Sequence, residues 1–256
     1  MIDTHAHINH ERLESFLPEI INSLNEKKLK CIICPSYDKK SANKALEFSQ
    51  KYEKVFGALA IHPTESQFYD EEFEHFLTKN LSDKKIVALG EYGLDYHFLP
   101  FDKDTQIEVF LKQLNIAKKQ KIQSIFHVRD AFDDFLPLLK QNLGGFCGGV
   151  VHCYDSSLEN AKKILDLGLM ISFTGILTFK QREELREVFK YVPNDRFMLE
   201  TDSPYLAPVP FRGQVCIPMM VEEVYKLSAT LKNLKIEELK ELLEKNAKTF
   251  FKKLVI

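Results

Sequence analysis

The chain has 256 residues, of which 45% are hydrophobic and 28% are charged, and 35 basic against 37 acidic side chains give a formal net charge of −2. This is the composition of an ordinary globular protein, and it excludes a disordered chain, a collagen-like fibre and a small disulfide scaffold. The near-neutral charge also excludes binding of nucleic acid by a bulk positive field, so an anionic partner has to be held by a local site such as a metal or a few arginines.

The location of the protein is indicated by what its sequence lacks. No apolar run approaches the roughly 18 to 20 residues of a membrane span, and the N-terminus opens with Ile2, Asp3 and His5 instead of a basic region leading into an apolar stretch. The five cysteines are an odd number, which favours reduced thiols over disulfides. We therefore expect a cytoplasmic protein with no membrane association and no obligate protein partner.

Short apolar runs typical of β-strands alternate along the chain with longer stretches of helical periodicity. The runs cover residues 1–2, 31–34, 55–61, 86–89, 122–126, 149–151, 169–173 and 197–199. Apolar residues spaced three and four apart predict helices between them, as at 13–24 and 107–117, and again at 236–254. No linker or low-complexity segment divides the chain, so we predict one domain over residues 1–256.

This alternation predicts the fold class. Strands that alternate with helices need crossover connections and form a parallel sheet. Eight such units in about 250 residues match the size and count of a closed (β/α)₈ TIM barrel, an α/β fold. An open doubly wound sheet is the alternative, because periodicity alone does not show closure.

Two histidines follow the first predicted strand. A parallel barrel carries its active site at the C-terminal ends of its strands, and His5 and His7 stand at that place. Because they are two residues apart on an extended chain, both imidazoles point the same way and can share a metal. A lone pair of this kind can also be solvated or capping, but its place directly after a strand favours ligands.

Further polar residues stand at the ends of four other runs. Glu91 lies in a glycine-containing segment after the fourth run, where the backbone is free to turn and the carboxylate can approach a ligand closely. His127 and His152 end the fifth and sixth runs, and Asp202 follows the eighth. Taken singly, these residues could be a loop glutamate, two core histidines and a turn aspartate.

The argument depends on the whole set. Four of the eight histidines and two carboxylates fall at the ends of predicted strands from five of the eight units. Mixed imidazole and carboxylate ligands suit zinc, manganese or magnesium, and enough of them are present for two ions. The sequence therefore predicts a hydrolytic metal centre.

The same residues carry a resemblance to a known family. The motifs are DTHAH at residue 3, IHP at 61, GEYGLD at 90, FHVRDA at 126, VHCY at 151, ISFTGILTF at 171 and LETDSPYLAP at 199. In this order, and over nearly the whole chain, they resemble the TatD family of metal-dependent deoxyribonucleases, a branch of the amidohydrolase-like TIM barrels.

The resemblance implies a role for each matching position. His5 and His7 bind one divalent ion together with Asp202, and Glu91 bridges to a second ion. That second ion is completed by His127 and His152.

The resemblance also places His62 and Arg129 on the substrate side. His62 alone is equally explained as a turn histidine before Pro63, and Arg129 as a surface ion-pair partner. Arginine is nevertheless the side chain best shaped to hold a phosphate by two parallel hydrogen bonds. Phe98 and Phe101 could line the mouth of the site and stack on a base.

Two segments depart from the family pattern. Residues 212–218 read RGQVCIP where the family commonly has Arg-Gly-Lys-Arg-Asn-Glu-Pro, which removes two cations, an amide and a carboxylate. After His152, Tyr154-Asp155-Ser156 replaces the usual Phe-Ser/Thr-Gly. Both changes alter loops on the substrate side, and neither touches a predicted ligand.

Together with the predicted metal centre, the resemblance implies a metal-dependent deoxyribonuclease of the 3′ to 5′ exonuclease type, which cleaves phosphodiester bonds with two divalent ions (Mg, Mn or Zn). Asp202 and Glu91 are the predicted catalytic residues, with Asp202 orienting or deprotonating the attacking water. Without a basic groove, single strands or frayed ends of DNA are the expected substrates.

Two other functions stay open on the sequence. The first is a metal-dependent esterase or deacylase that acts on aminoacylated RNA or another carboxyl ester, since the same ligands serve that chemistry. The second is a metal-binding scaffold without activity. Glu91 and Asp202 argue against the scaffold, because a structural zinc site usually closes with cysteines.

Overall fold

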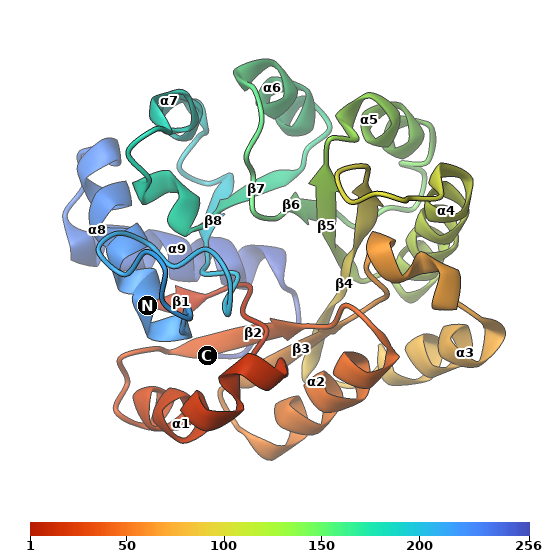
Figure 1. The fold of residues 1–256 in the computed structure, drawn as a ribbon, viewed down its shortest axis with the longest axis horizontal. Helices are drawn as coiled ribbons and strands as arrows, with labels where there is room; N and C mark the ends of the chain where they lie inside the picture. The colour runs from red at the N-terminus through yellow and green to blue at the C-terminus, as the bar shows by residue number, and fades with distance from the viewer.

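The structure is a computed structural model that describes all 256 residues. Eight parallel strands form one sheet in which each strand pairs with the next along the chain, from β1 to β8 (Figure 1). The strands are β1 (Ile2–Asp3), β2 (Cys31–Pro35), β3 (Val55–Leu59), β4 (Ile86–Asp95), β5 (Gln123–Arg129), β6 (Gly149–Val151), β7 (Met170–Phe173) and β8 (Phe197–Leu199).

The sheet curls until its two edges meet. An isolated parallel bridge joins Ala6 to Ser203. Beside it the His7 amide donates to the Ser203 carbonyl at 2.8 Å, and the Asp202 amide donates to the His5 carbonyl at 2.9 Å. The barrel is nearly closed, so the predicted TIM barrel is confirmed and the open sheet is excluded.

Helices separate the strands and surround the barrel in Figure 1. They are α1 (Leu17–Asn25), α2 (Lys39–Lys51), α3 (Glu71–Asn80), α4 (Lys103–Gln120), α5 (Phe132–Gln141), α6 (Leu158–Asp166), α7 (Glu183–Tyr191), α8 (Val221–Lys232) and α9 (Ile236–Phe250). Aspartates begin three of them, since Asp38, Asp70 and Asp102 each accept a hydrogen bond from a backbone amide of the first turn. None of the helices is both long enough and apolar enough to span a membrane.

The first predicted helix, at 13–24, consists of two pieces. A 3₁₀-helix over Glu11–Phe16 precedes α1, and Pro18 lies in the first turn of α1. Proline is tolerated there because the first amides of a helix have no partner within it.

The last helix, α9, closes the N-terminal end of the barrel. Its residues Ala247 and Phe250, with Phe251 and Leu254 after it, share one apolar cluster with strand residues that point into the barrel. The strand members of this cluster include Ile2, Cys31, Ile33, Phe56, Ala58, Val87, Ile125, Val150, Met170 and Met198. With that end filled by apolar side chains, the opposite end is left for chemistry.

Two strands run past their apolar cores. The predicted strand 86–89 extends to Asp95, and the predicted strand 122–126 shifts and extends to Arg129. The extra residues pair with each other, as Leu94 does with Val128. The sequence had predicted that Glu91 and His127 follow their strands. In the structure both residues lie within the strands instead. The third predicted strand ends two residues early, at Leu59.

Candidate metal centre

All six predicted ligands meet at the C-terminal mouth of the barrel. The loop after β1 carries two of them, β4 and β5 carry one each, and the segments after β6 and β8 carry one each. In that order the ligands are His5, His7, Glu91, His127, His152 and Asp202. Five units of the barrel thus contribute to one cluster, as the sequence predicted.

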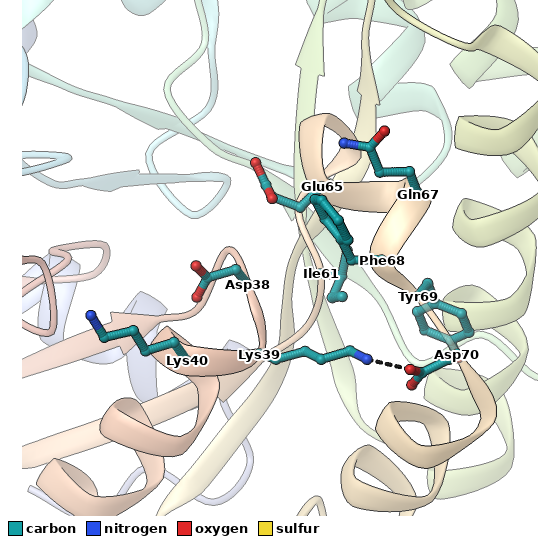
Figure 2. A pocket seen from close by; sticks show the side chains of 9 residues that line it. All are labelled: Asp38, Lys39, Lys40, Ile61, Glu65, Gln67, Phe68, Tyr69 and Asp70. Atoms are coloured by element: carbon teal, nitrogen blue, oxygen red, sulfur yellow. Dashed lines mark hydrogen bonds and ion pairs between the residues drawn. The ribbon is translucent and has the colours of Figure 1, made fainter.

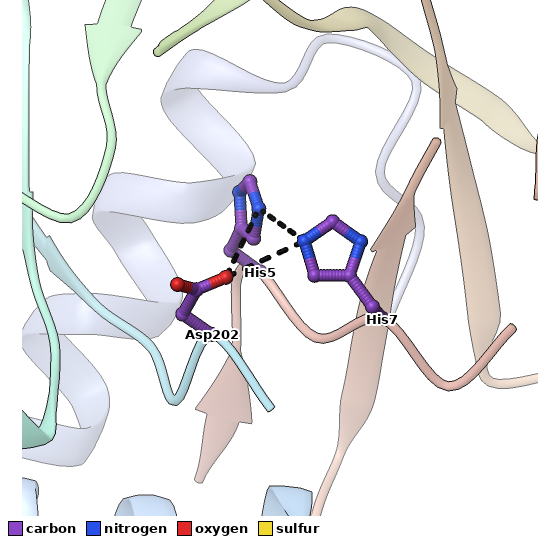
Figure 3. Close-up of side chains that lie close together, drawn as sticks. All are labelled: His5, His7 and Asp202. Atoms are coloured by element: carbon purple, nitrogen blue, oxygen red, sulfur yellow. Dashed lines mark hydrogen bonds and ion pairs between the residues drawn. The ribbon is translucent and has the colours of Figure 1, made fainter. Parts of the chain in front are cut away.

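Three of these side chains form a first group (Figure 3). The Nε2 atoms of His5 and His7 are 3.3 Å apart, and Oδ1 of Asp202 is 3.7 Å from the first and 3.4 Å from the second. Ligand atoms about 2.1 Å from one ion, at tetrahedral or octahedral angles, are about 3.0 to 3.4 Å apart. The spacing of this group fits a single divalent ion.

Glu91, His127 and His152 form a second group. Oε2 of Glu91 is 2.7 Å from Nε2 of His152 and 3.7 Å from Nδ1 of His127, and those two nitrogens are 3.1 Å apart. The other oxygen of Glu91 is 3.2 Å from Nε2 of His7. Glu91 therefore stands between the two groups, with one oxygen toward each.

A β-bulge directs Glu91 into the mouth. In the pairing of β4 with β5, Gly90 is opposite Ile125 and Tyr92 is opposite Phe126, so that Glu91 has no partner. Such a bulge turns a side chain out of the regular alternation of a strand. Gly90 is required beside it, because a Cβ atom there would lie 2.6 Å from Cβ of Ile125.

The donor set fits divalent cations. Burial by itself would raise the pKa of Glu91, but the neighbouring His152 and His5 outweigh it and hold the pKa well below 4.5. In the same way His7 and His5 hold the pKa of Asp202 below 3.8 against the effect of burial. The site thus presents two ionised carboxylates among imidazole nitrogens. Oε2 of Glu91 is also buried without a hydrogen bond of good geometry. Buried charge and an unsatisfied oxygen are the features that a bound cation would resolve.

Two further carboxylates hold the histidines from behind, and sequence analysis did not single them out. Oδ2 of Asp95 is 2.8 Å from Nε2 of His127. Glu200 lies 3.6 Å from Nδ1 of His152 and accepts a hydrogen bond from the Cys153 amide at 2.8 Å. Carboxylates in this position fix the ring and the tautomer of a ligating histidine. Asp95 ends the motif GEYGLD and Glu200 lies in the motif LETD, so these two motifs were the sequence signal that could have identified them.

A third buried carboxylate, Asp3, positions the backbone near the site and not a histidine ring. It is fully buried, and its oxygens accept hydrogen bonds from the amides of His5 and Thr201 and from the Thr201 hydroxyl. This aspartate therefore ties the loop that carries His5 to the segment that carries Asp202. Burial raises the pKa of Asp3 to about 8.

His62 and Arg129 both lie at the mouth. The ring of His62 packs edge-on against His127, with centroids 4.2 Å apart, and burial and His127 lower the pKa of His62 to about 3. It also accepts a hydrogen bond from the Thr64 amide, so it is a turn histidine as well. Arg129 is exposed, and its guanidinium is 5.0 Å from the centroid of the Phe98 ring.

A groove adjoins this side of the mouth, between the N-terminal ends of α2 and α3 (Figure 2). Its lining consists of Asp38, Lys39, Lys40, Ile61, Glu65, Gln67, Phe68, Tyr69 and Asp70. Lys39 pairs with Asp70 across it. None of the six predicted ligands lines this groove, so it is separate from the candidate metal centre.

Comparison with known proteins agrees with this geometry. The family described as TatD related DNase matches residues 2–252 of the chain. The chain belongs to the TatD family. It is 36% identical to the uncharacterized metal-dependent hydrolase YabD of Bacillus subtilis over 98% of this chain and 99% of that protein. It is 35% identical to the uncharacterized metal-dependent hydrolase YcfH of Escherichia coli K12 over 98% of this chain and 95% of that one.

A solved structure of this family has the same fold. The crystal structure of YjjV, a TatD homologue from Escherichia coli K12, superposes with a TM-score of 0.89 at 27% identity and covers 98% of both chains. As a member of the TatD family the protein is a metal-dependent hydrolase. The resemblance read from its motifs is thereby confirmed.

Proposed function

We propose that this TatD protein is a deoxyribonuclease that removes nucleotides from the 3′ ends of DNA by hydrolysing phosphodiester bonds with two divalent ions. The observation that carries the proposal is the position of Glu91, with one oxygen 3.2 Å from His7 and the other 2.7 Å from His152. A carboxylate that stands between two groups of histidines can be shared by two ions, which is what a two-ion site of this composition would use.

In this proposal His5, His7 and Asp202 hold one ion, His127 and His152 hold the other, and Glu91 is shared. Magnesium, manganese or zinc bound there would polarise the phosphoryl oxygens and lower the pKa of water. Asp202 is ionised at neutral pH and mostly buried, with 14% of its side chain exposed, so we assign it as the base that accepts the proton of the attacking water.

The substrate side is formed by His62 and Arg129. The low pKa of His62 keeps its imidazole neutral, so that it can donate one hydrogen bond to a phosphoryl oxygen without carrying charge. Arg129 has no carboxylate partner, which leaves its planar fork of donors for a phosphate. A phosphodiester satisfies this pair better than a carboxyl ester does, and this favours nuclease over deacylase activity.

The test compares two substrates under matched metal. A single-stranded DNA oligonucleotide labelled at its 5′ end should be shortened progressively, chelation should stop the reaction, and a blocked 3′ end should suppress it. An aminoacyl ester should be hydrolysed much more slowly. Faster hydrolysis of the ester would show that the protein is the deacylase instead, and equal cleavage of circular single-stranded DNA would show that no end is needed.

A further inference from the structure

The six arginines of the chain fall into two classes. Three are bonded within the fold: Arg182 pairs with Asp155 at 3.0 Å, Arg186 donates to the Phe179 carbonyl at 2.8 Å, and Arg196 donates to the Gly168 carbonyl at 3.1 Å. The guanidinium groups of the other three, which are Arg12, Arg129 and Arg212, have neither a hydrogen bond nor an ion pair and are exposed.

Each unpaired arginine lies over an aromatic ring. The guanidinium carbon is 5.6 Å from the ring centroid of Tyr205 for Arg12, 5.0 Å from that of Phe98 for Arg129, and 3.7 Å from that of Phe179 for Arg212. The flat face of a guanidinium stacks on a ring while its N–H edge stays free. Each arginine therefore offers donors suited to a phosphate, and the exposed rings of Tyr205 and Phe98 are also suited to a base, whereas Phe179 is half-buried and packs against the core.

All three pairs lie at the mouth of the barrel. Arg12 follows β1 and Tyr205 follows β8, whereas Phe98 follows β4 and Arg129 is the last residue of β5. In a barrel of eight strands β4 is opposite β8 and β5 is opposite β1, and Figure 1 shows these two halves on either side of the barrel axis. The Arg12–Tyr205 pair thus faces the Arg129–Phe98 pair with the predicted ligands between them. The Arg212–Phe179 pair follows β8 and β7, next to the first.

The Tyr205 ring is fixed to the site as well as exposed. Its backbone amide donates to the Asp202 carbonyl at 3.0 Å, and its hydroxyl is 3.2 Å from Nε2 of His10. Even so, 44% of Tyr205 is exposed, and so is 56% of Phe98. A rigid ring that is open to solvent stacks on a base with little loss of side-chain entropy.

Building on the proposed function, we infer that the three arginine–aromatic pairs are subsites for single-stranded DNA. The strand crosses the mouth from the Arg129–Phe98 pair to the Arg12–Tyr205 pair, and the Arg212–Phe179 pair contacts it at the side. Each arginine binds a backbone phosphate, and the exposed rings of Tyr205 and Phe98 each stack on an unpaired base. Duplex DNA is excluded because its bases are stacked on each other and are not available to protein rings.

Binding of a short, fluorescein-labelled oligothymidylate tests this inference. Anisotropy is measured on the metal-loaded protein in an Asp202→Asn background, so that turnover does not consume the probe. Arg12→Gln and Arg129→Gln should each weaken binding about tenfold. Each should also reduce, by about one, the steepness with which the logarithm of the binding constant falls with the logarithm of the salt concentration. Tyr205→Leu should weaken it about tenfold through lost stacking. The matched control is Arg196→Gln, at the opposite end of the barrel, which should change affinity less than about twofold.

Two results would overturn the inference. One is equal weakening, or none, in Arg12→Gln, Arg129→Gln and Arg196→Gln. The other is binding of a hairpin duplex as tightly as the single strand. Unchanged metal content and unfolding temperature establish that each variant is folded. Arg12→Lys keeps the charge but loses the planar fork, so its affinity for oligothymidylate should lie between that of Arg12→Gln and that of the parent protein.

Failure of the inference is distinguishable from failure of the proposed function. An enzyme that shortens DNA with the same kcat/KM in Arg12→Gln contradicts the subsites and leaves the nuclease proposal intact. A protein that binds oligothymidylate through Arg12 and Arg129 but hydrolyses only an aminoacyl ester contradicts the nuclease proposal and leaves the subsites intact.

Discussion

At the scale of single residues, the two carboxylates at the front of the site differ in what surrounds them. Glu91 is enclosed by histidines on both sides, with one oxygen toward His7 and the other toward His152. Asp202 touches only the first pair of histidines and stays partly open to the mouth. This difference is the basis for assigning the bridging role to Glu91 and the proton-accepting role to Asp202.

Replacing Asp202 separates these two roles. Asp202→Asn keeps the shape and one ligand oxygen but removes the negative charge, so the amide cannot take a proton from water. We expect the rate on a short oligonucleotide to fall about 10²-fold or more, the usual scale for losing a general base. Metal content at saturating concentration, measured on the same sample, should fall much less. If excess metal restores the rate, Asp202 is only a ligand.

The carboxylate behind His127 should act through the ligand and not on the substrate. Asp95→Asn removes the charge that fixes the His127 ring, 2.8 Å from Nε2, and should weaken metal affinity by about 10- to 100-fold. Competition with a chelator of known affinity measures this. Asp130→Asn is the matched control, because Asp130 is exposed and contacts only His97. Equal affinities in the two variants would remove Asp95 from the metal site.

At the scale of elements, the paired extensions of β4 and β5 carry two of the six predicted ligands, Glu91 and His127. Gly93 is necessary to this pairing, because it has a φ of +155° and a Cβ atom there would lie 1.9 Å from the His127 carbonyl oxygen. Any side chain at Gly93 must therefore push the two strands apart beneath Glu91 and His127.

Gly93→Ala should be strongly destabilising. Strain at this φ and overpacking against β5 each cost about 1 to 3 kcal/mol, so the free energy of unfolding should fall by about 3 kcal/mol or more. Denaturant unfolding provides the measurement. Gly144→Ala is the control, since its Cβ atom would have no neighbour within 4 Å and should change stability by less than about 0.5 kcal/mol. A neutral Gly93→Ala would mean that β4 and β5 do not pair at this point.

At the scale of the whole molecule, the candidate metal centre joins segments from both ends of the chain. The loop after β1 and the segment after β8 close the barrel at the Ala6–Ser203 bridge, next to His7 and Asp202. An ion shared by His5, His7 and Asp202 would therefore hold the seam together, in addition to any role in chemistry.

Removal of metal should destabilise the fold. A ligand present at about 100 times its Kd contributes about 2.7 kcal/mol per site, so chelation should lower the unfolding temperature by several degrees. Re-addition of magnesium, manganese or zinc should restore it, with elemental analysis giving two ions per chain. Affinity should fall as the pH is lowered, because protonated imidazoles do not bind metal. A stoichiometry of one that is insensitive to replacing His127 and His152 together would exclude the two-ion site.

The sequence by itself was enough to predict the barrel and to place the six predicted ligands at one end of it. Alternating apolar runs and amphipathic stretches specify parallel strands with crossover helices, and consecutive parallel strands bring their C-terminal ends to one face. Residues such as His5 and Asp202 could therefore be placed together although 197 positions separate them in the chain. The local pattern of apolar and polar residues is sufficient to predict this arrangement, because the order of the strands in the sheet is their order along the chain.

Only the tertiary structure decided the remainder. The bulge at Glu91 and the length of β5 follow from pairing between strands, which apolar patterning does not record. The contacts of Asp95 with His127 and of Glu200 with Cys153 join residues 32 and 47 positions apart. Helix α9 covers the N-terminal end of the barrel because the apolar strand side chains there have no other element packed over them. These features arise from contacts between distant segments, and such contacts exist only once the barrel has closed.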